Sequence, residues 1–222
     1  MTRREREDAK KEPIEFEAPV EETVTEEVSD TMDSNIQALQ QEIEERKKAQ
    51  AALELLATQD GLTGISNRRH VLELGSRAFE QAQRYRRPLT AIMLDIDHFK
   101  EINDTFGHSA GDKILAQTAA RMQMVLRKVD ILGRYGGDEF IIFLPETSQE
   151  GARRLAERLR ESVSYQHEFN GGQSVEITVS MGICSTYGAA ASLTLDELIR
   201  RADQALYSSK QSGRNRVSIY ER

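Results

Sequence analysis

One short acidic turn between two mostly apolar runs constrains this chain more than any other feature. The turn is Arg134-Tyr135-Gly136-Gly137-Asp138-Glu139-Phe140, and the apolar runs cover 129–132 and 140–144. Runs of this length predict buried strands, and the glycines between them predict a β-hairpin, because glycine takes a positive φ without a steric clash. The tip presents two adjacent carboxylates, which suit divalent metal binding or proton abstraction. Ordinary turn chemistry with solvated acids is the alternative.

A second stretch, 90–97, is an apolar strand that contains Asp95 and Asp97 at its end. A buried strand that delivers a carboxylate beside a hairpin carrying two more is the arrangement of a two-metal phosphoryl- or nucleotidyl-transfer site. A strand end followed by a helix cap is the alternative reading of these two acids. Two independent acidic strand ends favour the transfer site.

Four blocks of sequence resemble the GGDEF family of diguanylate cyclases, and they occur in the order and spacing of that family. Together they extend over 60–222, nearly three quarters of the chain. A lone Gly-Gly-Asp-Glu-Phe is suggestive, whereas four blocks at matching spacing are highly specific. The blocks are 60–69, 95–112, 134–140 and 202–207, the last followed by Lys210 and Arg214.

The predicted elements alternate helices with strands, which favours an α+β fold with a mostly antiparallel sheet flanked by helices. The resemblance sharpens this expectation to the palm-like, ferredoxin-related fold shared with class III nucleotidyl cyclases. The single cysteine, Cys184, lies in a strand-like run and is expected to be a small buried core residue. Strands are expected at 90–97, 129–132, 140–144, 175–185 and 217–220. A turn is expected at 170–172. Helices are expected from Ser66 or Asn67 to 85, and over 110–128, 148–163 and 195–212.

The family's reaction joins two GTP molecules into cyclic di-GMP and releases two pyrophosphates. Each subunit holds one GTP, so the resemblance implies a homodimer whose active site is completed only across two subunits. Two other classes are weighed against this enzyme. One is a catalytically inactive module that only binds GTP or cyclic di-GMP, and the other is a scaffold that acts through the N-terminal helix. Degenerate members lose the acids or glycines of the hairpin, whereas here all four are present.

The resemblance also assigns metal ligands and catalytic residues. It implies that Asp95, the backbone carbonyl of Ile96, Asp138 and Glu139 bind the metal. Asp138 is also the proton acceptor, and Lys100 and Glu139 join it as catalytic residues. Oxygen ligands suit Mg²⁺, with Mn²⁺ as a substitute. Some members have Glu where this chain has Asp138, so the metal or water geometry must adjust by one methylene.

The same comparison implies the GTP-binding residues. Asn103 and Asp112 resemble the guanine readers, although on their own they would read as a loop-capping amide and a helix cap. Lys100, Lys210 and Arg214 resemble phosphate-binding cations, a role that suits their charge, whereas solvated surface is the ordinary place for them. His108 and Phe99 complete the expected nucleotide contacts.

Arg127 and Asp130 match the RxxD site through which the product inhibits members of the family. Arginine binds phosphate and guanine, and aspartate accepts from the guanine edge. Arg158 matches a secondary arginine that reaches a neighbouring domain's bound product. The alternative for Arg127 and Asp130 is an i, i+3 surface ion pair, which contributes little.

Three segments are expected. Residues 1–30 hold 5 basic and 11 acidic residues and are predicted to be a disordered tail, which a protein partner could bind. Residues 31–58 are predicted to be a helix that dimerises as a short coiled coil, with folding back onto its own domain as the alternative. Residues 59–222 form the predicted GGDEF domain. The stripe of the helix contains Ile36, Leu39, Ile43, Leu53 and Ala57, interrupted by Arg46 and Gln50.

Charge and hydropathy limit the other classes. The acidic tail accounts for −6 of the net charge of −7, so the remaining body is close to neutral and lacks the basic surface of a nucleic-acid-binding protein. The sequence shows no apolar run near the ~20 residues that span a bilayer and no apolar stretch typical of a secretory signal. We therefore expect a cytoplasmic protein without membrane contact.

Overall fold

The computed structural model describes residues 20–168, 172, 174–186 and 193–221; of residues 20–31, 33 and 34 only the backbone is described. The chain divides into two compact units, Met1–Ala52 and Leu53–Arg222, and each is treated by itself.

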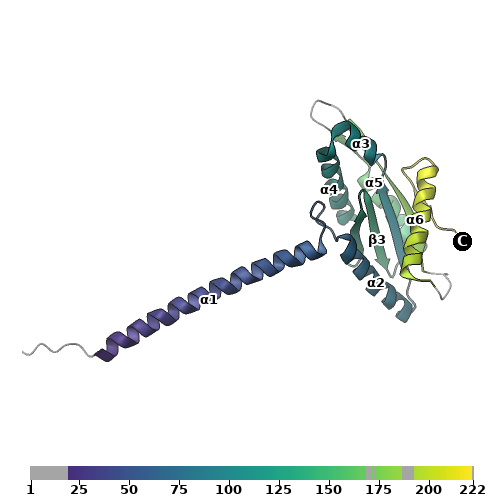
Figure 1. The fold of residues 1–222 in the computed structure, drawn as a ribbon. Helices are drawn as coiled ribbons and strands as arrows, with labels where there is room; N and C mark the ends of the chain where they lie inside the picture. Colours follow the sequence, from purple (N-terminus) through teal and green to yellow (C-terminus); the bar gives the residue numbers. More distant parts are fainter. Residues whose placement is uncertain (1–19, 169–171, 173, 187–192, 222) are drawn as a thin grey trace, which may run out of the picture. The chain divides into compact units, whose positions relative to one another are not determined.

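Helix α1 (Val20–Thr58) makes up the described part of the first unit and continues into the second (Figure 1). It begins at Val20 rather than at Thr31, so 20–30 is helical where the sequence predicted disorder. After Pro19, no proline or glycine interrupts the sequence before the helix ends. Residues 1–19 lie outside the described residues. Four apolar side chains of the predicted stripe are exposed in the single chain, namely Ile36, Leu39, Ile43 and Leu53, and the fifth, Ala57, is half-buried.

The second unit is built on a five-stranded sheet with the order β2-β3-β1-β6-β7. Every neighbouring pair is antiparallel except β6 and β7, which are parallel. The predicted mostly antiparallel sheet is thus confirmed. The strands are β1 (Leu89–Ile96), β2 (Ile131–Gly136), β3 (Glu139–Pro145), β6 (Val179–Ser185) and β7 (Val217–Ile219).

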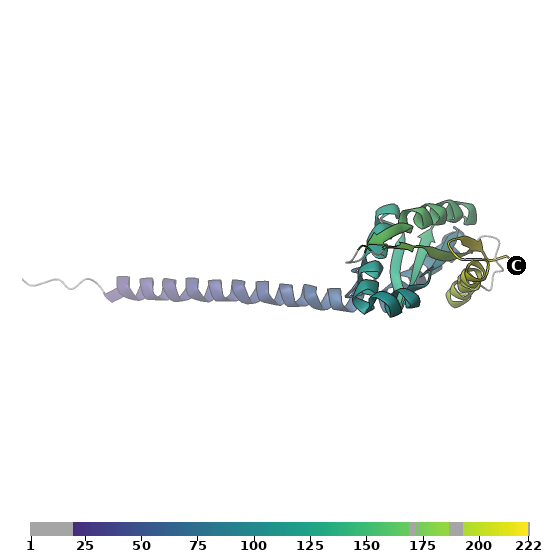
Figure 2. The same cartoon turned by 90° about the horizontal axis from the view of Figure 1, so that it is seen from above.

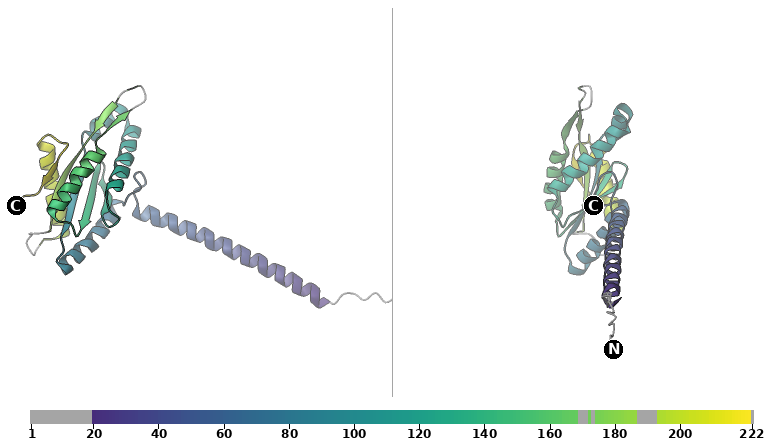
Figure 3. Two further views of the ribbon diagram at one scale, coloured as in Figure 1. Left: turned by 180° about the vertical axis from the view of Figure 1, so that it is seen from behind. Right: turned by 90° about the vertical axis from the view of Figure 1, so that its left-hand side faces the viewer.

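Two hydrophobic cores cover the two faces of this sheet, because successive strand residues point to opposite sides. Ile92 and Leu94 of β1 pack into one core with α4 (His108–Val125) and α5 (Gln149–Val163). Met93 of β1 packs into the other core with α2 (Arg68–Tyr85) and α6 (Leu195–Gln211). Viewed from above, green α5 and yellow-green α6 lie on opposite sides of the strands, and α5 lies in front of the sheet in the view from behind (Figures 2 and 3).

Helix α6 packs unusually close to the sheet at Gly182 of β6. A Cβ atom at that position would lie 2.0 Å from the backbone nitrogen of Leu206 and 2.2 Å from the carbonyl oxygen of Ala202. Only a residue without a side chain lets the helix backbone approach the strand this closely.

Several predicted helix boundaries are confirmed by their caps. The side chain of Asn67 accepts a hydrogen bond from the backbone of His70 at the start of α2, and Ser148 does the same for Gly151 at the start of α5. Cys184 is buried on β6, as expected. The described residues include no helix long and apolar enough to cross a membrane.

Other elements differ from the prediction. The structure adds α3 (Phe99–Phe106) and a two-stranded sheet of β4 (Tyr165–Glu168) and β5 (Ser174–Ile177). The strand predicted over 175–185 is divided at Thr178, whose carbonyl accepts from the backbone of Asp97 and whose hydroxyl donates to its carboxylate. Of the turn predicted at 170–172, all but Gly172 lies outside the described residues.

Candidate functional site

The site lies where β1 and the β2–β3 hairpin end together. Asp95 of β1 and Glu139 of β3 are partners in the strand register, and both belong to the strand positions that face α2 and α6. Gly137 and Asp138 form the turn between β2 and β3, and Gly137 takes the positive φ of 38° that the sequence predicted for a glycine here. The predicted hairpin therefore does bring its acids to the strand end that carries Asp95.

Lys210 of α6 completes this cluster. Its Nζ atom lies 2.7 Å from Oδ2 of Asp95, although the two residues are 115 positions apart in the sequence. Burial raises the pKa of the Asp95 carboxyl to about 6, with a smaller upward effect from the charges of Asp138 and Glu139, while the hydrogen bond from Lys210 lowers it. The strand end thus holds a buried carboxyl that a positive charge would strongly stabilise in its ionised form.

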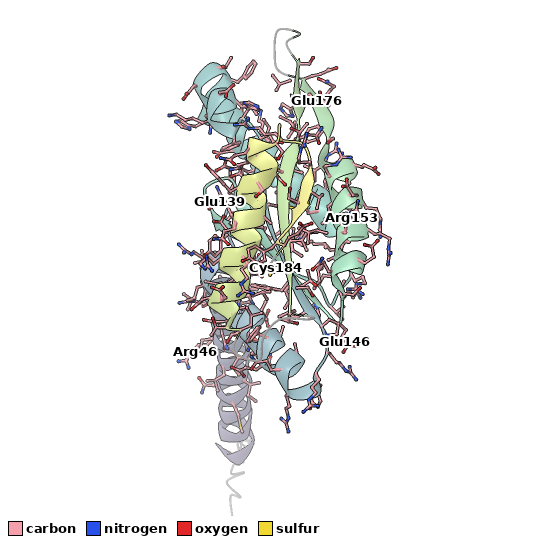
Figure 4. The ribbon with its side chains drawn as sticks, turned by 90° about the vertical axis from the view of Figure 1, so that its right-hand side faces the viewer. Arg46, Glu139, Glu146, Arg153, Glu176 and Cys184 are labelled. Carbon is pink, nitrogen blue, oxygen red and sulfur yellow. The ribbon has the colours of Figure 1, made fainter. Side chains whose placement is uncertain are left out.

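Glu139 lies beside α6 at the edge of a cavity of about 490 Å³ (Figure 4). Asp203 of α6 lines the same cavity, and so does Arg68, whose guanidinium stacks over the ring of Tyr135 at 4.6 Å. Burial, Asp203 and Asp138 raise the pKa of Glu139, and Lys210 and Arg68 oppose them. Sequence reasoning missed Arg68 and Asp203, although both lie within the blocks that resemble the family.

The predicted metal donors fit a hard divalent cation in chemistry. Asp95, Asp138 and Glu139 offer only oxygen, and the charges of Asp138 and Glu139 add to burial in raising the pKa of Asp95. Within the described ranges, no three acid, histidine or cysteine side chains are close enough to form a ready-made metal site. Further oxygen ligands would therefore have to come from the substrate's phosphates, from water or from the carbonyl of Ile96, which ends β1.

The predicted guanine readers come together between α3 and α4. The Oδ1 atom of Asn103 is buried and has no hydrogen-bond partner in the described part of the chain. It lies against Gly111, where a Cβ would come within 2.0 Å of it and 3.0 Å of the Phe99 ring. Asp112 and His108 are exposed on the first turns of α4. Gly111 is thus required for this packing, a role that the Ala-Gly-Asp sequence alone did not reveal.

Two further predicted cations lie at the α3 side of the site. Lys100 is exposed on α3. The ring of His98 hydrogen-bonds Glu101 and lowers the pKa of its carboxyl, and the charge of Arg214 lowers it further. Arg214, in the turn between α6 and β7, therefore lies close enough to α3 for its charge to be felt there.

Asp97 has a different role from Asp95. Its carboxylate is buried and accepts hydrogen bonds from the hydroxyl groups of Thr178 and Ser180 and from the backbone of Asn215. These bonds fasten the end of β1 to β6 and to the α6–β7 turn. Of the two acids that the sequence placed at this strand end, only Asp95 contacts a charged group of the site.

The predicted inhibitory residues are partly assembled. Arg127 donates to both carboxylate oxygens of Asp130, with the shortest distance 2.7 Å from Nη2 to Oδ1, and Nη2 also donates to the hydroxyl of Thr147. They also line a cavity of about 560 Å³ with the turn at 58–66. Arg158 is exposed on α5, and within the described part of the chain it forms no hydrogen bond or ion pair with Arg127 or Asp130. The structure shows an i, i+3 ion pair in which the Arg127 guanidinium is exposed and the Asp130 carboxylate is buried.

Arg134 links the hairpin to the turn between α1 and α2. Its guanidinium donates to the carboxylate of Asp60 at 3.2 Å and to the carbonyl of Gly137 at 2.8 and 2.9 Å. Asp60 also accepts from the backbone and hydroxyl of Thr63. Sequence reasoning placed both residues in family-like blocks but did not foresee their contact.

The chain is similar to known proteins in sequence and in structure. Residues 57–216 match the family described as "Diguanylate cyclase, GGDEF domain". Response regulator PleD of Caulobacter vibrioides is 39% identical over 174 residues, which cover 78% of this chain and 38% of PleD. The chain thus spans well under half of that relative.

Two solved structures are also similar. The coiled coil and GGDEF domain of DgcB from Caulobacter crescentus, in complex with c-di-GMP, superposes with a TM-score of 0.77 at 30% identity, covering 85% of this chain and 99% of that one. Diguanylate cyclase SiaD of Pseudomonas aeruginosa, in complex with its activator SiaC, gives a TM-score of 0.70 at 32% identity, covering 90% and 75%.

Proposed function

The chain belongs to the GGDEF family of diguanylate cyclases, and from this premise we propose that it condenses two GTP molecules into cyclic di-GMP. In each of two equivalent steps a ribose 3′-oxygen attacks the α-phosphorus of the other GTP. The bond to the β-phosphate breaks, and pyrophosphate leaves. The 3′-hydroxyl proton goes to Asp138. The observation that carries the proposal is the convergence of Asp95, Glu139 and Lys210 at one strand end.

The chain's own residues divide the work of binding and orientation. Lys100 and Lys210 bind the triphosphate as point charges, and Arg214 binds it through the forked N–H donors of its guanidinium. Asn103 and Asp112 read the guanine edge, and the buried, unpartnered Oδ1 atom of Asn103 supports a ligand contact at this place. Asp95, Ile96, Asp138 and Glu139 would hold Mg²⁺, or Mn²⁺ in its place. The bound ion would neutralise phosphate charge and acidify the attacking hydroxyl.

A second copy is required because each GTP must meet the other. The exposed stripe of α1 supports dimerisation through a two-stranded coiled coil. Arg46 interrupts this stripe and forms an ion pair with Glu42 of the same helix. The association of the two helices in the coiled coil is therefore weak and adjustable. SiaD, which is solved with an activator protein, supports the further proposal that this chain receives a protein partner, for which the N-terminal segment is the expected place.

The product is proposed to inhibit the enzyme at Arg127 and Asp130, with Arg158 as a contact from a neighbouring domain. The exposed Arg127 guanidinium supports this role, because a nucleotide phosphate can compete for its donors. The alternative function is a module that binds GTP or cyclic di-GMP without turnover. The complete set of hairpin glycines and acids favours the enzyme.

The test is to incubate the purified chain with GTP and Mg²⁺ and to separate the nucleotides by chromatography. We expect cyclic di-GMP and pyrophosphate in a ratio of one to two. Asp138→Ala should abolish the product while the fold is kept, and Glu161→Ala, which removes an exposed acid of α5, should leave it unchanged. Binding of GTP without product would support the binding module instead.

A further inference from the structure

The turn between α6 and β7 has an unusual backbone. Gly213, Arg214 and Asn215 are consecutive and all have positive φ, at 110°, 61° and 45°. Glycine adopts this region freely, whereas a residue with a side chain does so at a cost in conformational energy. Contacts outside the turn must therefore hold Arg214 and Asn215 in place.

The first of these contacts comes from Asp97, the residue that directly follows β1. Oδ2 of Asp97 accepts a hydrogen bond from the backbone nitrogen of Asn215 at 3.0 Å. The same oxygen accepts from the hydroxyl of Thr178 at 2.8 Å, and Oδ1 accepts from the hydroxyl of Ser180 at 2.7 Å. Asp97 is only 4% exposed. Its carboxylate is thus fixed on three sides and offers the turn a rigid attachment.

The second contact comes from α5. Nη1 of Arg160 donates to Oδ1 of Asn215 at 2.9 Å, and Nε of the same guanidinium is held by Glu157 at 2.9 Å. Asn215 is therefore bound through its backbone to β1 and through its side chain to α5. Both bonding residues precede the turn in the sequence, Asp97 by 118 positions and Arg160 by 55.

We propose that Asp97 and Arg160 are positioning residues for Arg214, which they orient through Asn215. The inference rests on the proposed function, in which Arg214 and Lys210 bind the triphosphate. Asp95 contacts Lys210 at one side of the turn, and Asp97 contacts Asn215 at the other. The end of β1 thereby sets the spacing of both phosphate-binding cations from the strand end that carries the reaction.

The backbone around Arg214 supports this reading. Its nitrogen donates to the carbonyl of Ser209 at 3.1 Å, and its carbonyl accepts from Nε of Arg216 at 3.0 Å. With both backbone groups bonded and Asn215 fixed next to it, the Cα–Cβ direction of Arg214 is set by the turn. Releasing Asn215 would let the turn relax toward negative φ and redirect that side chain.

The test measures equilibrium binding of 3′-deoxy-GTP with Mg²⁺ by calorimetry, because this analogue lacks the attacking hydroxyl and is not turned over. Two variants remove the same bond from opposite sides: Arg160→Met, and Asn215→Gly, which keeps the left-handed backbone accessible. The matched control is Arg154→Met, which removes another ion-paired arginine of α5 whose partner, Glu150, is on its own helix. Asp97→Asn is the stronger variant, with folding checked by circular dichroism.

We expect Arg160→Met and Asn215→Gly each to weaken binding by about three- to tenfold, the range for one hydrogen bond. The double variant should be no weaker than either single one. In an Arg214→Ala background, Arg160→Met should have no further effect, since the residue it orients is gone. Arg154→Met should bind as the wild type does.

Three results would overturn the inference: unchanged binding by Arg160→Met, equal weakening by Arg154→Met, or an undiminished effect of Arg160→Met in the Arg214→Ala background. The last would show that Arg160 acts on the fold or on other contacts. A wild type that binds the analogue but makes no cyclic di-GMP would contradict the proposed enzyme and leave this inference standing.

Discussion

Asp60 and Arg134 form an ion pair across 74 positions of sequence, and the same guanidinium holds the carbonyl of Gly137 at the hairpin tip. Both side chains are largely buried, at 22% and 19% exposed. The backbone nitrogen of Arg134 also donates to the carbonyl of Ser66, which lies in the same turn between α1 and α2. The turn that follows α1 and the turn that carries Asp138 are therefore joined by one side chain.

We expect Asp60→Asn to lower kcat for cyclic di-GMP synthesis by about tenfold, because loss of the ion pair loosens Arg134 and with it the hairpin that must hold the reacting groups in place. Steady-state kinetics at saturating GTP is the measurement. The control is Glu73→Gln, which removes an exposed pair with Arg69 at 3.8 Å. Equal kcat values for Asp60→Asn and the wild type would show that the contact does not position the hairpin.

The same pair predicts a pH dependence of stability. Burial acts to raise the pKa of Asp60, but hydrogen bonds from Thr63 and the charge of Arg134 outweigh it, so the pKa in the folded protein is lowered. A carboxyl with a lowered pKa stabilises the fold above its unfolded pKa, near 4, and loses this contribution as the pH falls through the folded value. The free energy of unfolding of the wild type should therefore exceed that of the Asp60→Asn variant by a constant amount above about pH 4. Below that pH the two values should converge. Urea unfolding from pH 3 to pH 7 tests this, and a difference that persists unchanged to pH 3 would contradict it.

Arg127→Ala should relieve inhibition by cyclic di-GMP without removing activity. The substitution takes away the donors for a ligand phosphate, while the buried Asp130 carboxylate keeps the hydrogen bond from the backbone nitrogen of residue 127. The measurement is the initial rate at increasing product concentration. Arg153→Ala, which removes an exposed arginine of α5 (Figure 4), is the control. If product inhibits both variants as it does the wild type, the pair is structural only.

Removal of residues 1–52 should leave a folded domain, because the last turn of α1 belongs to the second unit. The carbonyl of Ala57 accepts hydrogen bonds from the side chains of Asn67 and Arg69, so a cut at Thr58 would remove these contacts, whereas a start at Leu53 keeps them. The shortened protein should be monomeric and lose specific activity at low concentration, since the coiled coil supplies an effective concentration of about 1 mM.

Specific activity against protein concentration, with sedimentation alongside, checks this prediction. Partial recovery at high concentration is expected for domains that still meet by diffusion. Full activity of the shortened protein at nanomolar concentration would show that the N-terminal helix does not dimerise the enzyme, and its role as a docking segment would then be tested.

The sequence predicted the hairpin, β1 and most of the long helices, because each carries a strong local signal. The apolar run of β1 and the side-chain caps of α2 and α5 are such signals. Helix α3 gave none: it has eight residues, one buried side chain in Ile102, and a left-handed N-cap, His98, without a side-chain cap bond. The start of α1 was misplaced because an acidic composition, typical of disordered segments, outweighed the absence of helix breakers.

The candidate site was predicted in its members but not in its contacts. Asp95, Asp138 and Glu139 were found from strand ends, whereas Lys210 depended on the family resemblance, because nothing local links it to β1. Asp97 and Asp95 look alike in sequence, and only the fold separates a fastening carboxylate from one that faces the site. The pair of Asp60 and Arg134 could not be predicted, because it depends on the position of the turn between α1 and α2, which no local pattern determines.

The absence of a side chain at Gly182 also affects how the site responds to ionic strength. Salt screens a charge that approaches from solvent more than it screens the partly buried pair of Lys210 and Asp95, and the distance of α6 from the strand is set by direct contact of two backbones. Ionic strength can therefore change how tightly the nucleotide is held without moving the helix that holds it. Lys210 is therefore carried by a helix whose distance from the sheet is fixed. Any change in the geometry of the site has to come from other elements of the chain.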